Sequence, residues 1–451
     1  MNSKIFKAYD IRGVYPEELN EEMAYKIGLA FIKFTNAKNI LVGEDARVSS
    51  PSLRDSLVKG LRSAGANVFL AGELTTPMFY FGVAEGKNYD AGIMVTASHN
   101  PGKYNGFKLV KGDLLPIGEG SGMEEIRDLA INGDLPTTKE GELHNVEIKN
   151  NYIKKVLSLI SLNSIKPLKI VIDTGNGMEG TVLPDLLKNL LQLDVTKLFF
   201  DVDMSFPNHE ANPLKEETLE SLKKEVVRQN ANLGVAYDGD ADRIGFVDEK
   251  GETVRADYIL TLLLENLYKK YPGSITLYDL RCSKIVPETI KKLEGTPKMT
   301  RVGHAFIKKN LREYNAIAAG ELSSHFYFKD FYGVECGELV MLYILQLLSE
   351  KKAPFSQIVS PFKKYYQSGE INFEVEDKES KIKELKEKYS DNATDISELD
   401  GIRIEFNNED EFWWFNVRAS NTEPLLRLNL EASNEKLLQE KLEELSSFIK
   451  K

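Results

Sequence analysis

The order strand, polar turn, helix, strand recurs three times along the chain, and this recurrence constrains the fold more than any other feature. In the first copy, strand-like residues 40–43 precede a helical pattern at 52–64. The second copy runs from an apolar segment at 169–173, through a glycine-rich turn, to an amphipathic run at 182–191, and a third occupies residues 274–293. Such alternation is typical of βαβ units and therefore predicts α/β domains with helices on the faces of the sheets.

The last part of the chain has a different pattern. Strand-like segments at 401–406, 413–417 and 425–431 are grouped together, between helical patterns at 381–389 and 435–449. Grouped strands bracketed by helices favour a separate α+β domain, and 451 residues are too many for one hydrophobic core. We therefore predict an α/β protein with three related mixed α/β domains and a smaller C-terminal α+β domain. The predicted bounds are 1–150, 151–252, 253–365 and 366–451.

Ser98 lies where an open α/β sheet places a catalytic group. The apolar run 91–95 reads as a buried strand, and the segment TASHNP at 96–101 follows it directly, so the hydroxyl is expected at the carboxyl end of a strand. By itself the segment fits an ordinary loop equally well. Neighbouring side chains of an extended segment point to opposite faces, so we expect His99 to orient the loop. No Gly-x-Ser-x-Gly pattern supports a serine hydrolase.

Asp238, Asp240 and Asp242 predict a metal site. Three carboxylates at alternate positions repel one another unless a cation lies among them, and a few hard oxygen ligands suit Mg²⁺. A calcium loop fits less well, because Arg243 stands where the sharp turn of that loop needs glycine and the preceding segment is strand-like. A solvated acidic turn is the other alternative.

Five motifs, in this order, resemble those of the α-D-phosphohexomutase superfamily, and within it the phosphomannomutase/phosphoglucomutase branch. They are FKAYDIRG at 6–13, TASHNP with its continuation YNGFK to residue 108, DGDADR at 238–243, GELSSH at 320–325 and RASNTEP at 418–424. The resemblance extends over essentially the whole chain. It implies three α/β domains and a smaller fourth, arranged around one central cleft.

The resemblance also implies an activity, the interconversion of hexose 1-phosphate and hexose 6-phosphate. The sugar is mannose or glucose, and the reaction passes through a phosphoserine and a bisphosphorylated intermediate. Ser98 would carry the phosphoryl group and, with Asp238, Asp240 and Asp242, hold one Mg²⁺ per chain, while a hexose 1,6-bisphosphate would be the activator. The residues implied at the reaction centre are Ser98, Arg12, Lys108, Arg243, His304 and His325. Which of Lys108, His304 and His325 moves the proton stays open.

Two further loops are implied to bind substrate. The residues are Glu321, Ser323, His325 and Arg281 for the sugar end, and Arg418, Ser420, Asn421 and Thr422 for the phosphate that does not react. The hydroxyls, amide and guanidinium of the last loop suit an anion, although an exposed hairpin turn fits the same spacing. Two positions depart from the family pattern: Ser324 stands where Gly or Ala is usual, and Arg281 where Lys is common.

Charge and composition argue against several other classes of protein. A net charge of −11 disfavours nucleic acid and anionic membranes as partners. No apolar run approaches the roughly 20 residues of a membrane span, the N-terminus lacks a signal-peptide pattern, and only two cysteines are present. We expect a cytoplasmic monomer or homodimer that acts on small hexose phosphates. The alternatives are a phosphoglucosamine mutase and a non-catalytic relative that binds sugar phosphate or metal.

Overall fold

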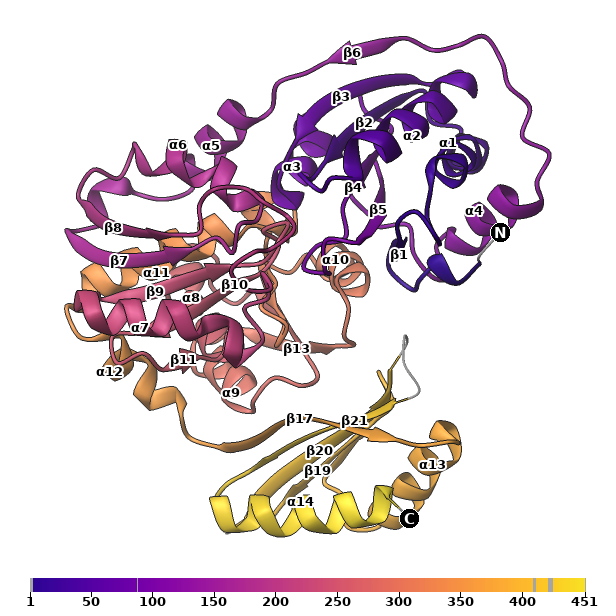
Figure 1. Cartoon of the computed structure of the whole chain (residues 1–451). Helices are drawn as coiled ribbons and strands as arrows, with labels where there is room; N and C mark the ends of the chain where they lie inside the picture. The colour runs from indigo at the N-terminus through magenta and orange to yellow at the C-terminus, as the bar shows by residue number, and fades with distance from the viewer. Residues whose placement is uncertain (1–2, 87, 409–410, 421–424, 451) are drawn as a thin grey trace.

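The strands of the protein form four sheets that follow one another along the chain. The structure is a computed structural model, and it describes residues 3–86, 88–408, 411–420 and 425–450. In Figure 1 the first three sheets and their helices form one upper body, and the fourth sheet lies below it. Within the described residues, no helix combines the length and the apolar character needed to cross a membrane.

The first two sheets contain eleven strands. The first sheet and its helices are β1 (Ile11–Val14), α1 (Glu21–Thr35), β2 (Asn39–Glu44), α2 (Ser50–Ser63), β3 (Asn67–Glu73), α3 (Thr76–Glu85), β4 (Ala91–Val95), β5 (Tyr104–Lys111), α4 (Met123–Asn132) and β6 (Leu143–Asn145). The second group is α5 (Lys149–Ser158), β7 (Leu168–Asp173), α6 (Leu183–Leu187), β8 (Leu193–Leu198), α7 (Glu220–Gln229), β9 (Leu233–Tyr237), β10 (Ile244–Asp248) and β11 (Thr253–Val254).

The other two sheets contain ten strands. The third group is α8 (Ala256–Lys270), β12 (Ile275–Asp279), α9 (Ile285–Lys292), β13 (Thr296–Thr300), α10 (His304–Glu313), β14 (Ala318–Gly320), β15 (Phe326–Phe328), β16 (Val334–Glu335), α11 (Gly337–Lys351) and α12 (Phe355–Val359). The fourth group is β17 (Tyr366–Glu374), α13 (Lys378–Tyr389), β18 (Asp395–Ser397), β19 (Ile402–Asn407), β20 (Phe412–Ala419), β21 (Leu425–Ala432) and α14 (Glu435–Ile449).

The first three sheets share one four-strand arrangement. It is β3-β2-β4-β5 in the first sheet, β8-β7-β9-β10 in the second and β13-β12-β14-β15 in the third. In each case the first three strands along the chain are parallel, and the fourth is antiparallel to the third. The fourth sheet is antiparallel throughout. The predicted fold class, three related mixed α/β domains and a C-terminal α+β domain, is confirmed.

The hydrophobic core of the fourth domain is separate from that of the other three. One cluster of buried side chains runs through the first three domains, from Phe81 on α3 through Ile170 on β7 to Leu345 on α11. The first domain also has a cluster of its own, which includes Ile27 and Phe107. The fourth domain has a separate cluster that includes Leu428 and Leu445. A buried polar contact joins the third and fourth domains, where the backbone N–H of Lys284 donates to the carboxylate of Glu431 at 2.8 Å. The fourth domain therefore packs as its own unit beside the upper body.

The helix predicted over residues 182–191 is wrong for much of its length. A 3₁₀ turn, Met178–Thr181, leads into α6, which ends at Leu187. Leu190 is buried, whereas Leu191 is 88% exposed. The apolar residues at the end of this run therefore belong to the turn that leads into β8, and they do not form one face of a helix.

Candidate active site

Three loops occupy the same position in the three related sheets, between the third and fourth strands of each. Residues 96–103 join β4 to β5, residues 238–243 join β9 to β10, and residues 321–325 join β14 to β15. Each loop has one non-glycine residue with left-handed backbone, at Ser98 (φ 52°), Ala241 (φ 65°) and Ser324 (φ 66°). Such strained positions tend to cluster at functional sites.

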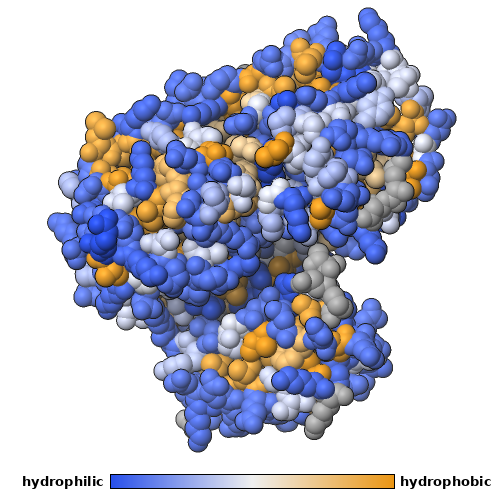
Figure 2. All heavy atoms as spheres, viewed as in Figure 1, coloured by the Kyte–Doolittle hydropathy of each residue, from blue (hydrophilic) through white to orange (hydrophobic). Residues whose placement is uncertain are grey.

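These loops and the fourth domain line one cleft of about 1210 Å³. In the space-filling view, where most of the visible surface is hydrophilic, an indentation separates the fourth domain from the upper body (Figure 2). The predicted site residues on the wall of the cleft are Arg243, Arg281, His304, Glu321, Ser323, His325, Arg418 and Ser420. The predicted residues Asn421 and Thr422 lie outside the described residues.

The hydroxyl of Ser98 faces the acidic loop of the second domain. Its Oγ donates a hydrogen bond to Asp238 Oδ2 at 2.9 Å, and the residue is 3% exposed. The two loops are in close contact, because a Cβ added at Gly239 would lie 2.4 Å from the carbonyl oxygen of Ser98. A glycine at this position therefore lets the metal loop approach the seryl oxygen.

The expectation that His99 points away from Ser98 is wrong. His99 Nδ1 lies 3.1 Å from Ser98 Oγ. The argument from alternating faces assumed an extended segment, whereas the positive φ of Ser98 turns the chain at this residue. Burial, and then the nearby Arg243 and Arg12, hold the pKa of His99 well below its usual value. The imidazole is therefore neutral beside the hydroxyl.

Arg47 contacts the backbone of the Ser98 loop, and this role was not predicted from the sequence. The guanidinium donates to four backbone carbonyl oxygens of this segment, those of residues 98, 100, 101 and 104, at 2.7–3.0 Å. Its Nε donates to Asp45 Oδ2 at 3.0 Å, and both side chains are fully buried. The loop conformation thus depends on a single charged side chain that follows β2.

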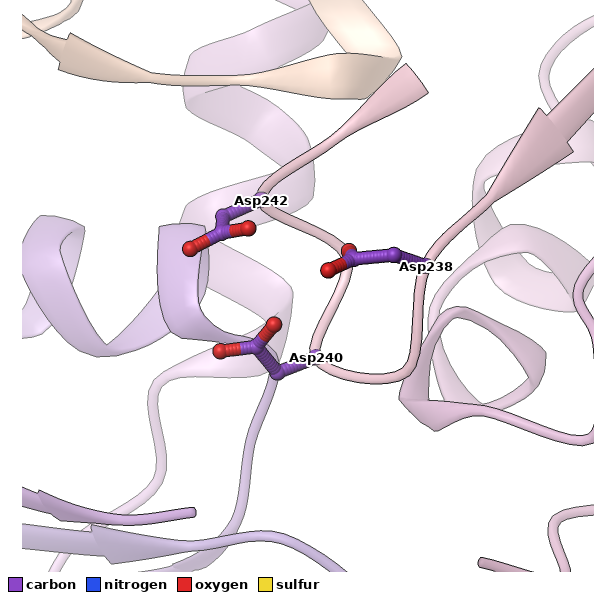
Figure 3. Close-up of side chains that lie close together, drawn as sticks. All are labelled: Asp238, Asp240 and Asp242. Atoms are coloured by element: carbon purple, nitrogen blue, oxygen red, sulfur yellow. The ribbon is translucent and has the colours of Figure 1, made fainter. Parts of the chain in front are cut away.

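Asp238, Asp240 and Asp242 each bring a carboxylate oxygen into one cluster, with these atoms within 4.8 Å of one another. The three side chains come from one loop and their carboxylates turn toward a common space (Figure 3). Asp240 Oδ1 is buried and has no partner among the described residues, whereas the buried Asp242 Oδ1 has His325 Nε2 3.3 Å away. Burial and the two neighbouring aspartates raise the pKa of Asp238 well above its usual value. These residues fit a hard divalent cation, which would satisfy the unpartnered oxygen.

Lys108 is buried and joins the acidic cluster from β5. Its Nζ donates to Asp240 Oδ2 and to Asp242 Oδ2, both at 2.6 Å. Burial by itself would lower the pKa of the ammonium, but the two carboxylates raise it well above its usual value. Lys108 is therefore a charged group within the acidic cluster, although the isolated pattern Asn-Gly-Phe-Lys by itself favours a surface lysine.

The loop between β14 and β15 presents Glu321, Ser323 and His325. Glu321 accepts from Tyr327 Oη at 2.7 Å and from the backbone N–H of Gly303 at 3.0 Å. Burial would raise the pKa of this carboxyl, but the contact with His325 lowers it to about 2. The carboxylate is thus ionised and fixed at the wall of the cleft.

His325 links this loop to the acidic cluster. Its Nδ1 lies 3.1 Å from Glu321 Oε2, and its Nε2 lies 3.3 Å from Asp242 Oδ1. Although burial lowers the pKa of the imidazole, these two carboxylates raise it to about 9. Ser323 Oγ lies 3.0 Å from the same Nδ1, so two residues of the loop contact this nitrogen.

His304 stands at the first position of α10, half-buried in the wall of the cleft. Burial, together with nearby Lys308 and Lys108, lowers the pKa of His304 well below its usual value. Its Nδ1 has no hydrogen-bond partner among the described residues.

The two predicted arginines of the reaction centre occupy different places. Arg243 Nε lies 3.4 Å from His325 Nε2. Arg12 contacts Asn100 and Asp10 at the edge of the Ser98 loop.

The far end of the cleft gathers three guanidinium groups around Glu370. Arg418 donates to Glu370 Oε2 at 3.2 Å, Arg427 donates to Oε1 at 3.2 Å, and Arg281 approaches within 3.7 Å. Arg418 and Arg427 are direct cross-strand neighbours on β20 and β21, a pairing that like charges disfavour. Arg281 is also paired with the buried Asp279 at 2.7 Å, so two carboxylates face three cations. The remaining excess of positive charge suits an anion. Sequence reasoning missed Arg427 and Glu370.

The chain has two further histidines, His144 and His209. His144 is exposed and stacks on Phe69 with ring centroids 5.0 Å apart. His209 Nε2 lies 3.1 Å from Asp173 Oδ2, at the end of β7.

Sequence models of the four domains of one enzyme family match this chain in order. They describe the phosphoglucomutase/phosphomannomutase α/β/α domains I, II and III, at residues 3–135, 150–251 and 255–365, and the C-terminal domain, at residues 370–447. Together they extend over most of the chain.

Similar proteins match over nearly their whole length. A phosphomannomutase of Methanocaldococcus jannaschii is 41% identical, over 99% of this chain and 98% of that protein. A protein named phosphohexose mutases in Xanthomonas campestris is 37% identical over the full length of both. Among solved structures, a phosphoglucomutase/phosphomannomutase family protein of Burkholderia thailandensis superposes with a TM-score of 0.89 and 31% identity, over 99% of this chain and 97% of that one.

Proposed function

The chain belongs to the phosphoglucomutase/phosphomannomutase family, and we propose that it interconverts the 1-phosphate and 6-phosphate of a hexose, mannose or glucose. The observation that carries this proposal is the contact of Ser98 Oγ with Asp238 at 2.9 Å, beside a cleft with a cationic far end. A phosphoryl group on Ser98 and a phosphate held near Arg418 would then lie at opposite ends of one bound sugar.

The reaction needs two transfers. In the first, the P–O bond to Ser98 Oγ breaks as a P–O bond forms to the free sugar hydroxyl; the proton of that hydroxyl passes to a base, and Ser98 Oγ takes up a proton. The bisphosphate turns over. In the second, the P–O bond between the sugar and its other phosphate breaks as a P–O bond forms to Ser98 Oγ, which gives up its proton, and the freed sugar oxygen takes up a proton in the positional isomer that leaves. Positioning and charge neutralisation provide most of the catalysis in such transfers. Arg243 and Lys108, which contact the acidic loop, would supply positive charge to the phosphoryl group.

Asp238, Asp240 and Asp242, with the phosphorylated Ser98, would hold one Mg²⁺. When bound, the ion would act as a Lewis acid on the phosphoryl group. The unpartnered Oδ1 of Asp240 supports this ligand set.

His304 is the group best suited to accept the proton from the sugar hydroxyl. Burial lowers its pKa and leaves it deprotonated near pH 7, and its Nδ1, in a residue that lines the cleft, has no partner among the described residues. A base must be deprotonated to accept a proton. We therefore propose that His304 removes the proton, and that His325 donates hydrogen bonds to oxygen atoms of the substrate.

Glu321 and Ser323 are proposed to bind the sugar end, and Arg418, Ser420, Asn421 and Thr422 the unreacting phosphate, with Arg281 beside Arg418 at that end. Hexose 1,6-bisphosphate would be the activator, because it can phosphorylate Ser98. The domain bounds near residues 150, 252 and 365 are also proposals. They fall close to the limits of the four sheets, although β11, at Thr253–Val254, still pairs with the second sheet.

A coupled assay would test the activity. Mannose 1-phosphate, glucose 1-phosphate and glucosamine 1-phosphate are compared with Mg²⁺ and a trace of bisphosphate activator. We expect turnover of mannose or glucose 1-phosphate. Preferred turnover of glucosamine 1-phosphate would favour the phosphoglucosamine mutase alternative, and no turnover of any of the three would favour a binding protein.

The variant Ser98→Ala tests the nucleophile. We expect turnover to fall by orders of magnitude while the far-ultraviolet circular dichroism spectrum is unchanged. Ser158→Ala, at an exposed position of α5, is the matched control and should retain activity. Near-normal turnover of Ser98→Ala would show that another group carries the phosphoryl.

A further inference from the structure

The first turn of α3, in the first domain, contacts the acidic loop of the second. Thr76 is the first residue of α3, and its hydroxyl donates to Asp240 Oδ2 at 2.6 Å. Its backbone N–H donates to the carbonyl oxygen of the same aspartate at 2.9 Å. Both residues are 0% exposed, so water does not compete for either bond. No step of the proposed mechanism uses Thr76.

The two carboxylate oxygens of Asp240 have different environments. Oδ2 accepts from Thr76 Oγ1 and from Lys108 Nζ, each at 2.6 Å. A carboxylate has about two acceptor positions on each oxygen, so these donors occupy Oδ2. Oδ1 is buried and has no partner among the described residues. Since a buried oxygen without a partner is costly, this atom is the one of Asp240 that is left for a cation.

We infer that Thr76 is a positioning residue of the metal site, which holds Asp240 Oδ2 so that Oδ1 faces the ion. This inference rests on the proposed function, because it takes the three aspartates to be the metal ligands. Groups that orient metal ligands through hydrogen bonds typically change metal affinity by about ten- to a hundredfold. The bond also joins the domain that carries Ser98 to the domain that carries the metal loop.

The alternative is that Thr76 only stabilises the start of α3. The adjacent residue provides a direct control for this alternative, because Thr75 caps the same helix by accepting from the backbone N–H of Met78 at 3.2 Å. Thr75 is as buried as Thr76. Removal of the Thr75 hydroxyl therefore weakens the helix terminus without removing the bond to Asp240.

The test is calorimetric titration of Mg²⁺ into the full-length protein and three variants. Thr76→Val keeps the shape and the backbone bond but loses the hydroxyl, so we expect the Kd for Mg²⁺ to rise by about ten- to a hundredfold. Thr76→Ser should restore the affinity of the unmodified protein. Thr75→Val should lower Tm and leave the Kd unchanged.

Several outcomes would overturn the inference. An unchanged Kd in Thr76→Val, or an equal loss in Thr75→Val, would show that Thr76 acts only through helix stability. If the unmodified protein binds no Mg²⁺ in this titration, the metal assignment itself fails and the inference fails with it. The two failures are distinguishable, because only the second affects the unmodified protein.

Discussion

Replacement of Arg47 by lysine should disable the enzyme while the charge at this position is retained. The five N–H groups of a guanidinium are all used here, four by carbonyl oxygens of the Ser98 segment and one by Asp45. An ammonium has only three donors, so at least two buried acceptors would lose their partner. Each hydrogen bond to a charged group contributes about 1.5–3 kcal/mol.

The expected loss follows from these bonds. Two of them at the lower value amount to about 3 kcal/mol, which corresponds to a decrease of roughly 150-fold in the population of the native loop conformation. Because the loop can open without unfolding of the sheet, we expect a large decrease in turnover and only a small decrease in Tm. Steady-state assays, with hydrogen exchange of a peptide that contains residues 96–105, would measure both effects.

Arg54→Lys is the matched control. Arg54 lies on α2 of the same domain, and its guanidinium contacts Glu44 and Asp55 rather than the Ser98 loop. We expect its turnover to stay near that of the unmodified protein. If Arg47→Lys also kept full turnover, with normal exchange in the loop, the reasoning that Arg47 holds Ser98 in place would be refuted.

Three other predictions concern the cleft, the core and the pH dependence of stability. Arg418→Met should raise KM by about tenfold or more, because one charge-assisted bond to phosphate is lost, and an unchanged KM would contradict the proposed phosphate site. Tyr152→Phe removes the 2.6 Å hydrogen bond to Glu338 and should lower the free energy of unfolding by about 1–3 kcal/mol without loss of turnover. Urea denaturation measures this free energy, and an unchanged value would contradict the prediction. Burial raises the pKa of Glu44 from 4.5 to about 7, so its contribution to stability is present below pH 4.5 and is lost as the pH rises toward 7. Glu44→Gln should therefore flatten the fall of the urea midpoint between pH 5 and 7, and an identical slope in variant and parent would refute this.

The residues of the loops could be chosen from the sequence, but the side chains that hold these loops in place could not. Ser98 and the three aspartates were predictable because each follows an apolar strand and combines rare residue types with turn chemistry. Arg47 was not, because its acceptors are backbone carbonyls, which leave no mark in the sequence. One signal was available: the pattern Asp-x-Arg stands at the end of the first parallel strand of both the first and the third domain, beginning at Asp45 directly after β2 and at Asp279, the last residue of β12.

The errors have local physical causes. The orientation of His99 was predicted from alternation along a strand, and the left-handed backbone of Ser98 removed the basis for that argument. The helix at 182–191 was predicted from apolar spacing, but part of that spacing serves a turn. The bond between Thr76 and Asp240 spans 164 residues, and no local pattern in the sequence could indicate such a contact.

The central claim is that Ser98 carries the phosphoryl group in a site completed by the acidic loop. The most direct measurement is tandem mass spectrometry of the protein after incubation with glucose 1,6-bisphosphate and Mg²⁺. The account predicts one phosphoryl group per chain, on the oxygen of Ser98. A modification located on His99, or a chain that stays unmodified under these conditions, would contradict it.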